Sequence, residues 1–331
     1  MEKMTAMTSR ERVRAVLNAE KLDRVPFNFW MDRNLMAALD AKFGSDFRIN
    51  HYGADVHETF IAYDWNCGLH ARYETDGKTH WQTAPALDDM AKVRALKFPE
   101  IAGAEDAVYN MVAADRKRLP GAAIFVQIPS PLDCFFNLRI MENAMIDFYE
   151  CEDECKHYID AAGRRLAEIV RGLKGRDIDL LYLAGDICSS RGPMMSEAML
   201  RRYCFDPMAE ALEEARKLGL KTFYHTDGAL KDILPLLVEY RFAGVNPLQP
   251  TINDSAAFKR QYGSDLMLYG GIDNCFAIPD SDPAGVRRHI RGQYEALGAD
   301  GGLIFSSHDI PDYVPLENID AMVDEIKKCG R

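Results

Sequence analysis

The feature that most constrains the fold is the alternation of short apolar runs with amphipathic segments of helix length. Six apolar runs of strand length recur after residue 120, at 123–128, 180–184, 221–225, 244–248, 266–270 and 303–306. They are almost continuously apolar, which is typical of parallel strands that are covered on both faces. Between them lie helix-length segments such as 207–217, where Met208, Leu212 and Ala215 face one way. The pattern predicts a parallel sheet wrapped by helices.

The number of strands favours a closed barrel. Residues 22–29 supply a seventh candidate strand, and an eighth is expected between residues 54 and 85 without a defined position. An open dinucleotide-binding sheet would carry G-x-G-x-x-G after its first strand, and the chain has no such sequence. No linker rich in Gly, Ser or Pro and no internal repeat divides the 331 residues. We therefore predict one (β/α)8 (TIM) barrel domain over residues 1–331.

Two additions to the barrel are expected near the start of the chain. Residues 8–11 read T-S-R-E, a capping box, and apolar residues follow at 13, 16 and 17 on one helical face. This pattern predicts an N-terminal helical extension. Residues 71–83 contain aromatic side chains and the turn signal Asp76-Gly77, which predict a small hairpin inserted in an early barrel loop.

The charge balance excludes several kinds of partner. The 51 acidic residues outnumber the 40 basic ones, for a net charge of −11, which argues against binding to nucleic acid or to an anionic membrane. The eight cysteines lack the regular spacing of a disulfide scaffold, so reduced thiols are expected. Residues 1–14 offer no apolar signal-peptide core, and no uncharged run approaches the ~20 residues of a membrane span. We predict a cytoplasmic protein.

Polar residues follow several of the predicted strands. They are Asp186, His225, Asp227, Asn246, Gln249, Asp273 and His308. In a barrel of this type the carboxyl ends of the strands and the loops after them form the functional face. We therefore expect these side chains to surround one pocket, with Gln249 and Asp273 in contact with the substrate.

His225, Asp227 and His308 form a candidate metal site. The first two are two residues apart at the exit of a strand, and His308 arrives from another strand. Three such ligands with an open fourth position are the arrangement of a catalytic zinc site. In the alternative reading each is a separate hydrogen-bonding residue at the start of a loop, and the H-x-D spacing alone does not decide between the two.

Several motifs, taken in order, resemble those of the uroporphyrinogen decarboxylase superfamily. They are Glu11-Arg12, Asp23-Arg24-Val25-Pro26, Gly185-Asp186, R-G-P-M-M-S at 191–196, His225-Thr226-Asp227-Gly228, Gly270-Gly271-Ile272-Asp273 and P-L-E-N-I at 315–319. The resemblance runs from about residue 8 to the C-terminus and implies a (β/α)8 barrel. The superfamily includes porphyrinogen decarboxylases and zinc-dependent methyltransferases that serve corrinoid proteins.

The decarboxylase branch fits less well. Its members carry an arginine-rich R-Q-A-G-R loop after the first strand, which grips the carboxylates of the substrate. Residues 29–34 of this chain read F-W-M-D-R-N, with a single arginine and an added acid. The chain thus lacks the bidentate donors needed to hold a polycarboxylate. By the same resemblance, Asp55 occupies the place of the decarboxylases' essential aspartate, and we expect it to contact the substrate.

The methyltransferase branch is more similar. Its thiol-methylating members bind zinc through H-x-C and a later cysteine just before P-x-E-N, where this chain has His225-x-Asp227 and His308. Nitrogen and oxygen ligands leave zinc a harder Lewis acid, which suits the departure of an ether oxygen. The resemblance implies a zinc-dependent transfer of a methyl group from a small-molecule methyl ether, such as a methoxylated aromatic, to cob(I)alamin. This O-demethylation would require a separate corrinoid protein docked at the barrel rim, because the chain has no corrinoid domain of its own.

In this interpretation His225, His308 and Asp186 are the catalytic residues. Asp186 is expected to orient the substrate or to donate a proton, and Trp30 and Tyr224 to provide apolar walls. Two alternatives stay open: a metal-free decarboxylase of a small acid, in which Asp186 and His308 transfer protons, and a non-catalytic relative that binds a small ligand or a corrinoid protein. The sequence is compatible with a homodimer and does not determine the oligomeric state.

Overall fold

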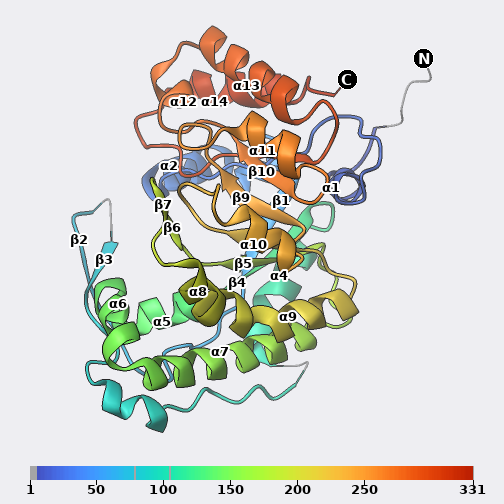
Figure 1. The fold of residues 1–331 in the computed structure, drawn as a ribbon. Helices are drawn as coiled ribbons and strands as arrows, with labels where there is room; N and C mark the ends of the chain where they lie inside the picture. Colours follow the sequence, from blue (N-terminus) through green and yellow to red (C-terminus); the bar gives the residue numbers. More distant parts are fainter. Residues whose placement is uncertain (1–5, 78–79, 104–105, 331) are drawn as a thin grey trace.

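The centre of the molecule is a parallel sheet. The computed structural model describes residues 6–77, 80–103 and 106–330, and within them seven strands form the sheet β1-β4-β5-β8-β9-β10-β11 (Figure 1). Their bounds are β1 Val56–Phe60, β4 Ala123–Pro129, β5 Leu180–Ala184, β8 Thr222–His225, β9 Gly244–Leu248, β10 Met267–Gly271 and β11 Leu303–Ser306. Every neighbouring pair is parallel. The strands therefore follow one another around the sheet in chain order, as in a TIM barrel.

Residues 26–29 close the sheet into a barrel. Phe27 forms a parallel bridge with Phe305 of β11, and the Phe305 amide donates to the Pro26 carbonyl at 2.9 Å. On the other side the Asp55 amide donates to the Phe27 carbonyl at 2.8 Å, directly before β1. The segment thus takes the place of the eighth strand, although it forms a bridge and not the full strand expected over residues 22–29. The predicted (β/α)8 fold is confirmed, and the strand that could not be placed is β1.

Helices and short elements surround the sheet. The helices are α1 Ser9–Leu17, α2 Arg33–Phe43, α3 Phe47–Asn50, α4 Asn110–Arg118, α5 Pro131–Arg139, α6 Met141–Glu150, α7 Glu152–Gly172, α8 Glu197–Leu200, α9 Asp206–Lys217, α10 Leu234–Glu239, α11 Ser255–Tyr262, α12 Ala277–Asp280, α13 Pro283–Leu297 and α14 Leu316–Ile326, with shorter turns η1 Met90–Ala95, η2 Ala107–Tyr109 and η3 Arg201–Phe205. Figure 1 shows α7 and α9 along one side of the sheet and α13 and α14 at the opposite side. Among the described helices, none is long and apolar enough to cross a lipid bilayer.

The two predicted additions are present. The Thr8 hydroxyl accepts a hydrogen bond from the Glu11 amide at 3.2 Å, and the Glu11 carboxylate accepts one from the Thr8 amide, so the capping box starts α1 as expected. Strands β2 (Arg72–Thr75) and β3 (His80–Ala84) pair antiparallel and project from the barrel as the predicted hairpin (Figure 1). A second short pair, β6 (Cys188–Ser189) and β7 (Gly192–Pro193), follows β5.

The buried side chains of the strands form two hydrophobic cores, according to the face of the sheet to which they point. One core lies inside the barrel, is built from strand residues such as Phe125, Tyr182 and Phe223, and is closed at one end by Val13 and Val16 of α1. The other lies between the sheet and its helices. Because successive side chains on a strand point to opposite faces, adjacent residues of one strand belong to different cores. This alternation decides which polar residues reach the barrel interior.

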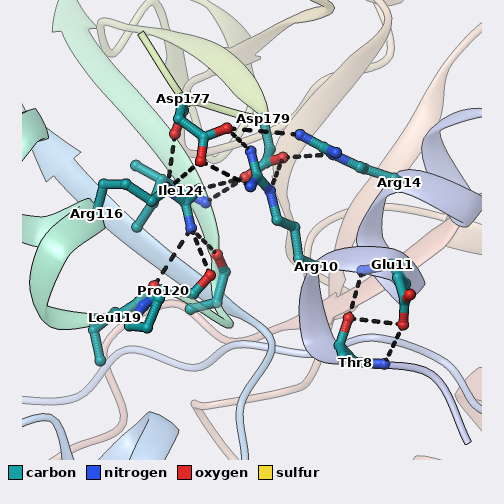
Figure 2. A network of polar contacts seen from close by, with 11 residues as sticks. Thr8, Arg10, Glu11, Arg14, Arg116, Leu119, Pro120, Ile124, Asp177 and Asp179 are labelled. Atoms are coloured by element: carbon teal, nitrogen blue, oxygen red, sulfur yellow. Dashed lines mark hydrogen bonds and ion pairs between the residues drawn. The ribbon is translucent and has the colours of Figure 1, made fainter.

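A buried ion-pair network joins helices to the amino-terminal ends of the strands (Figure 2). Asp179 lies just before β5, and its fully buried carboxylate accepts hydrogen bonds from Arg10 and Arg14 at 2.8 Å and from Arg116 at 2.9 Å. It also accepts one from the Ile124 amide at 3.0 Å. The network therefore ties α1 and α4 to the edge of β4 and β5.

Candidate functional site

A small cavity opens at the carboxyl ends of the strands. It has a volume of about 170 Å³ and is lined by Trp30, Glu58, Phe60, Gln127, Tyr182, His225, Asn246, Ser307, His308 and Asp309. An apolar cavity of about 150 Å³ is large enough for benzene, so this one suits a ligand with a single small ring. A larger cavity of about 400 Å³ lies at the other end of the barrel, beside Ala19 and Gly301, and none of the predicted site residues lines it.

His225 is the last residue of β8 and is held in one orientation by its neighbours. Its Nδ1 lies 2.9 Å from the Asn246 side-chain oxygen and 2.9 Å from the Tyr182 hydroxyl. The Asn246 side-chain nitrogen donates to the Tyr269 carbonyl at 3.0 Å, which turns the amide oxygen toward His225. Because that oxygen can only accept, Nδ1 carries a proton, and the Nε2 lone pair is left for a ligand.

Asp227 and His308 form the second part of the site. The Asp227 Oδ2 lies 3.2 Å from the His308 Nε2, and the Asp227 backbone amide donates to the Asp186 Oδ1 at 2.9 Å. Among the described residues, the buried Asp227 Oδ1 has no hydrogen-bond partner. Burial raises the pKa of Asp227, while His308 and His225 act in the opposite direction. The loop after β8 thus places a carboxylate with one unused oxygen next to His308.

The donor set fits zinc in type and in part of its geometry. Two atoms that share a tetrahedral zinc at about 2.0–2.1 Å lie about 3.3 Å apart, which is close to the separation between Asp227 and His308. The contact between Nδ1 of His225 and an acceptor oxygen is the outer contact that orients metal-binding histidines. Within the described residues, however, no three His, Cys, Asp or Glu side chains lie close enough to form a metal-binding group. Zinc binding by His225, Asp227 and His308 therefore stays a prediction.

Three other predicted residues lie at the same end of the barrel. Trp30 lines the cavity, and its indole nitrogen donates to the Glu58 Oε2 at 3.2 Å. Gln249 does not line the cavity; its side-chain oxygen accepts from the Gly228 amide at 2.9 Å and holds the loop after β8. Asp273 accepts hydrogen bonds from three backbone amides in the turn before α12. Gln249 and Asp273 therefore shape the loops, and the structure gives them no contact with the cavity.

Tyr224 and Asp55 lie elsewhere. Tyr224 immediately precedes His225 on β8 and so points to the opposite face, where it is fully buried and its hydroxyl donates to the Gly185 carbonyl at 3.0 Å. Asp55 precedes β1, and its fully buried carboxylate is bound by Arg12 at 2.6 Å and by Arg24 at 2.7 Å. The structure places both outside the cavity, so it does not support the expected contacts with substrate.

Two acidic residues at the site were missed from the sequence. Glu58 lines the cavity from β1, and strand alternation would have shown that it faces inward had β1 been located. Asp133 lies in the first turn of α5, beside Gly185. Burial and the neighbouring Asp186 raise the pKa of Asp133 to about 7. No local motif marks Asp133, because its proximity to Asp186 depends on the pairing of β4 with β5.

The fold and the rim residues define a TIM-barrel protein with histidines and carboxylates at the carboxyl end of its strands. The family model for uroporphyrinogen decarboxylase (URO-D) matches residues 62–329, and the chain belongs to this family, as the sequence motifs predicted. The structure is similar to that of a methyltransferase from Methanosarcina mazei, with a TM-score of 0.73 and 16% identity over 97% of this chain and 99% of that one.

A second solved structure shares the barrel. It is a B12-independent methionine synthase from Shewanella sp. W3-18-1 in complex with selenomethionine, with a TM-score of 0.53 and 11% identity over 92% of this chain and 94% of that one. At such low identities, both likenesses show the fold alone.

Proposed function

We propose that the protein is a methyltransferase that moves a methyl group from a methylated small molecule, such as a methoxylated aromatic, to the cob(I)alamin of a separate corrinoid protein. The observation that carries the proposal is the rim cavity. It has the volume of one small ring and joins aromatic walls to His225 and to the contact between Asp227 and His308. The structural likeness to a methyltransferase is consistent with this assignment.

The residues that would hold zinc are His225, Asp227 and His308. When bound, zinc would supply a Lewis acid toward the oxygen that leaves the methyl group. Asn246 keeps the Nε2 of His225 available, and Asp186 holds the backbone of Asp227 in place. As the methyl group passes to its acceptor, the methyl carbon–oxygen bond breaks and the oxygen takes up a proton. Asp186, which is exposed, is our candidate for the donor of that proton.

The corrinoid partner would dock on the rim of the barrel. Large aromatic side chains are exposed in the chain that follows three of the strands: Phe60 at the end of β1, Phe276 after β10 and Tyr313 after β11 are 44%, 63% and 66% exposed. Phe60 also lines the cavity, and exposed aromatic residues are typical of interaction surfaces. This arrangement supports docking of a partner at the end of the barrel where the methyl donor would bind.

The second candidate is a metal-free decarboxylase of a small carboxylic acid. It is favoured by Asp133, whose pKa is raised to about 7 by burial and by the nearby Asp186, so that the pair suits proton transfer. The ten described residues that line the cavity include neither lysine nor arginine. The substrate carboxylate would therefore lack the usual bidentate partner, and we place this function second.

The test combines metal analysis with a transfer assay. Zinc in the purified protein is measured by mass spectrometry, and methyl transfer from methoxy compounds to added cob(I)alamin is followed by visible absorption. We expect bound zinc and transfer in the parent, and loss of both in His225→Ala and His308→Ala. His157→Ala, at an exposed position on α7, is the matched control. Absence of metal together with unchanged activity in both variants would contradict the zinc site, and release of CO2 from a small acid without metal would favour the decarboxylase.

A further inference from the structure

Glu58 is a buried carboxylate that faces the cavity. Its side chain lies on the inner face of β1, and the residue is 5% exposed. Oε1 accepts hydrogen bonds from the Tyr269 hydroxyl at 2.6 Å and from the Asn28 amide at 3.3 Å, and Oε2 accepts one from the Trp30 indole at 3.2 Å. A carboxylate has about four acceptor positions, so one position on Oε2 is left for a ligand.

Glu58 forms no ion pair with the lysines and arginines that the structure describes, although the charge of the buried Arg48 acts on it. Among the described residues, no lysine or arginine nitrogen lies within 4.0 Å of the Glu58 oxygens. The Arg48 guanidinium lies against the Trp30 ring, 4.3 Å from its centre, and donates to the Asn28 side chain and the Phe29 carbonyl. Trp30 lines the cavity and Arg48 does not, so the positive charge is not presented to a bound ligand.

The remaining walls are formed by aromatic rings, by the polar side chains of Gln127, Asn246 and Ser307, by His225 and His308, and by one further carboxylate. Trp30, Phe60 and Tyr182 supply ring surfaces, and Asp309 adds a second carboxylate near the mouth. Aromatic faces attract neutral rings and cations, and a buried carboxylate repels a second negative charge strongly because the dielectric constant is low. The cavity therefore favours a ring with an O–H or N–H group and disfavours a ring that carries a carboxylate.

We propose that Glu58 selects the ligand of this cavity by charge. It accepts a hydrogen bond from a hydroxyl or amino group on a neutral or cationic donor with a single ring, and it excludes carboxylated donors of the same size. That the ligand is a methyl donor rests on the proposed function, whereas its charge and its hydrogen-bond donor follow from the contacts of Glu58. Glu58 is thus a specificity-determining residue.

The test uses two ligands of nearly the same shape, one with a neutral carboxamide and the other with a charged carboxylate. Binding of 4-hydroxy-3-methoxybenzamide and of 4-hydroxy-3-methoxybenzoate is measured by titration calorimetry at about pH 6.5, where the benzoate is ionised. The protein is first dialysed against a chelator, because zinc held by His225 and His308 in the same cavity would attract the carboxylate. We expect the parent to bind the benzamide at least about tenfold more tightly. Glu58→Gln should reduce that ratio by about fivefold or more, because it removes the charge and keeps the shape. Glu295→Gln, an exposed position on α13, changes the net charge equally and should leave the ratio unchanged.

A second pair of variants guards against misfolding. In Glu58→Gln the new side-chain nitrogen can face the Trp30 indole N–H, so that two hydrogen-bond donors oppose each other. The substitution is therefore also made in a Trp30→Phe background and compared with Trp30→Phe alone. The inference is overturned if the parent binds the benzoate as tightly as the benzamide or more tightly, or if neither ligand binds. It is also overturned if Glu58→Gln leaves the ratio of the two affinities unchanged in either background, provided that the variants fold. Binding of the benzamide without methyl transfer overturns only the proposed function, and equal methyl transfer from both ligands overturns only the role of Glu58.

Discussion

The buried carboxylates at the two ends of the barrel differ in whether arginines bind them. At the amino-terminal end, the side chains of Asp55 and Asp179 are fully buried, and each is bound by two or three arginines. At the carboxyl end, Glu58, Asp133 and Asp227 have no lysine or arginine ion pair among the described residues. A carboxylate that is surrounded by cations serves the structure, whereas one kept without them retains acceptor capacity, and burial raises the pKa of Asp133 and of Asp227. The difference separates a structural end from a functional end of the barrel.

The largest effect on folding should come from the structural end. Asp179→Ala removes the carboxylate shared by Arg10, Arg14 and Arg116 (Figure 2), and we expect the free energy of unfolding to fall by about 3–5 kcal/mol, as when a buried ion pair loses one partner. Urea denaturation measures the change. The matched variant Asp177→Ala, at a side chain that is 54% exposed, should cost less than about 1 kcal/mol. Equal costs for the two variants would contradict the comparison.

The opposite result is expected at the functional end. Asp186→Asn keeps the oxygen that accepts the Asp227 amide but removes the acid. We expect methyl transfer to fall by about 100-fold or more, since a general acid contributes about 10²- to 10⁴-fold. The free energy of unfolding should change by less than about 1 kcal/mol, since Asp186 is exposed. Both quantities are measured on one preparation, and a large loss of stability with unchanged activity would assign Asp186 to the structure.

The two ends should also respond oppositely to pH. Burial opposes ionisation of Asp23, but hydrogen bonds from Arg12 and the Met7 amide outweigh it and lower its pKa to about 2. Its contribution to stability is therefore present above pH 4 and lost as the pH falls toward 2. Burial and Asp186 raise the pKa of Asp133 to about 7, so its ionisation costs stability as the pH rises from about 4 through 7.

The check is a series of urea denaturations from pH 3 to pH 8. Relative to the parent, Asp133→Asn should gain stability as the pH rises from about 4 to about 7, and Asp23→Asn should lose less stability on acidification. Parallel curves for Asp133→Asn and the parent would contradict the pKa assigned to Asp133.

The smallest effect should come from Tyr224, on the outer face of β8. Tyr224→Phe removes the hydrogen bond to Gly185 and should cost about 1 kcal/mol of stability with little change in activity. Tyr182→Phe removes a contact to the Nδ1 of His225 inside the barrel and should lower activity more than stability. The activities of the two variants are compared by steady-state kinetics. A larger loss of activity in Tyr224→Phe than in Tyr182→Phe would contradict the assignment of Tyr182 to the inner face and Tyr224 to the outer face of the sheet.

Much of the fold could be predicted because its signals are local. The apolar runs, the capping box at residues 8–11 and the hairpin turn each depend on neighbouring residues. The segment at 26–29 and strand β1 were harder to place, because they are short and are held mainly by hydrogen bonds to distant chain, such as the bond from Phe305 to Pro26. Hydrogen bonds to distant strands do not produce a pattern of apolar residues that can be recognised in the sequence.

The candidate site was predicted in part. His225, Asp227 and His308 stand out because polar residues directly follow apolar strands, and the structure brings Asp227 and His308 into contact. Tyr224 was assigned to the site although it adjoins His225 on one strand, and alternation alone would have removed it. Asp55 was assigned by resemblance, and only its contacts with Arg12 and Arg24 showed that it belongs to the other end of the barrel.

The sequence by itself determined the barrel class, its additions and the family, because hydrophobic periodicity and ordered motifs are written in short stretches of chain. Only the tertiary structure decided which carboxylates meet arginines and which face the cavity. Glu58 and Tyr269 are 211 residues apart in sequence and form a 2.6 Å hydrogen bond inside the barrel. Such contacts arise when the barrel closes, and burial and pKa then depend on neighbours that the local sequence does not specify.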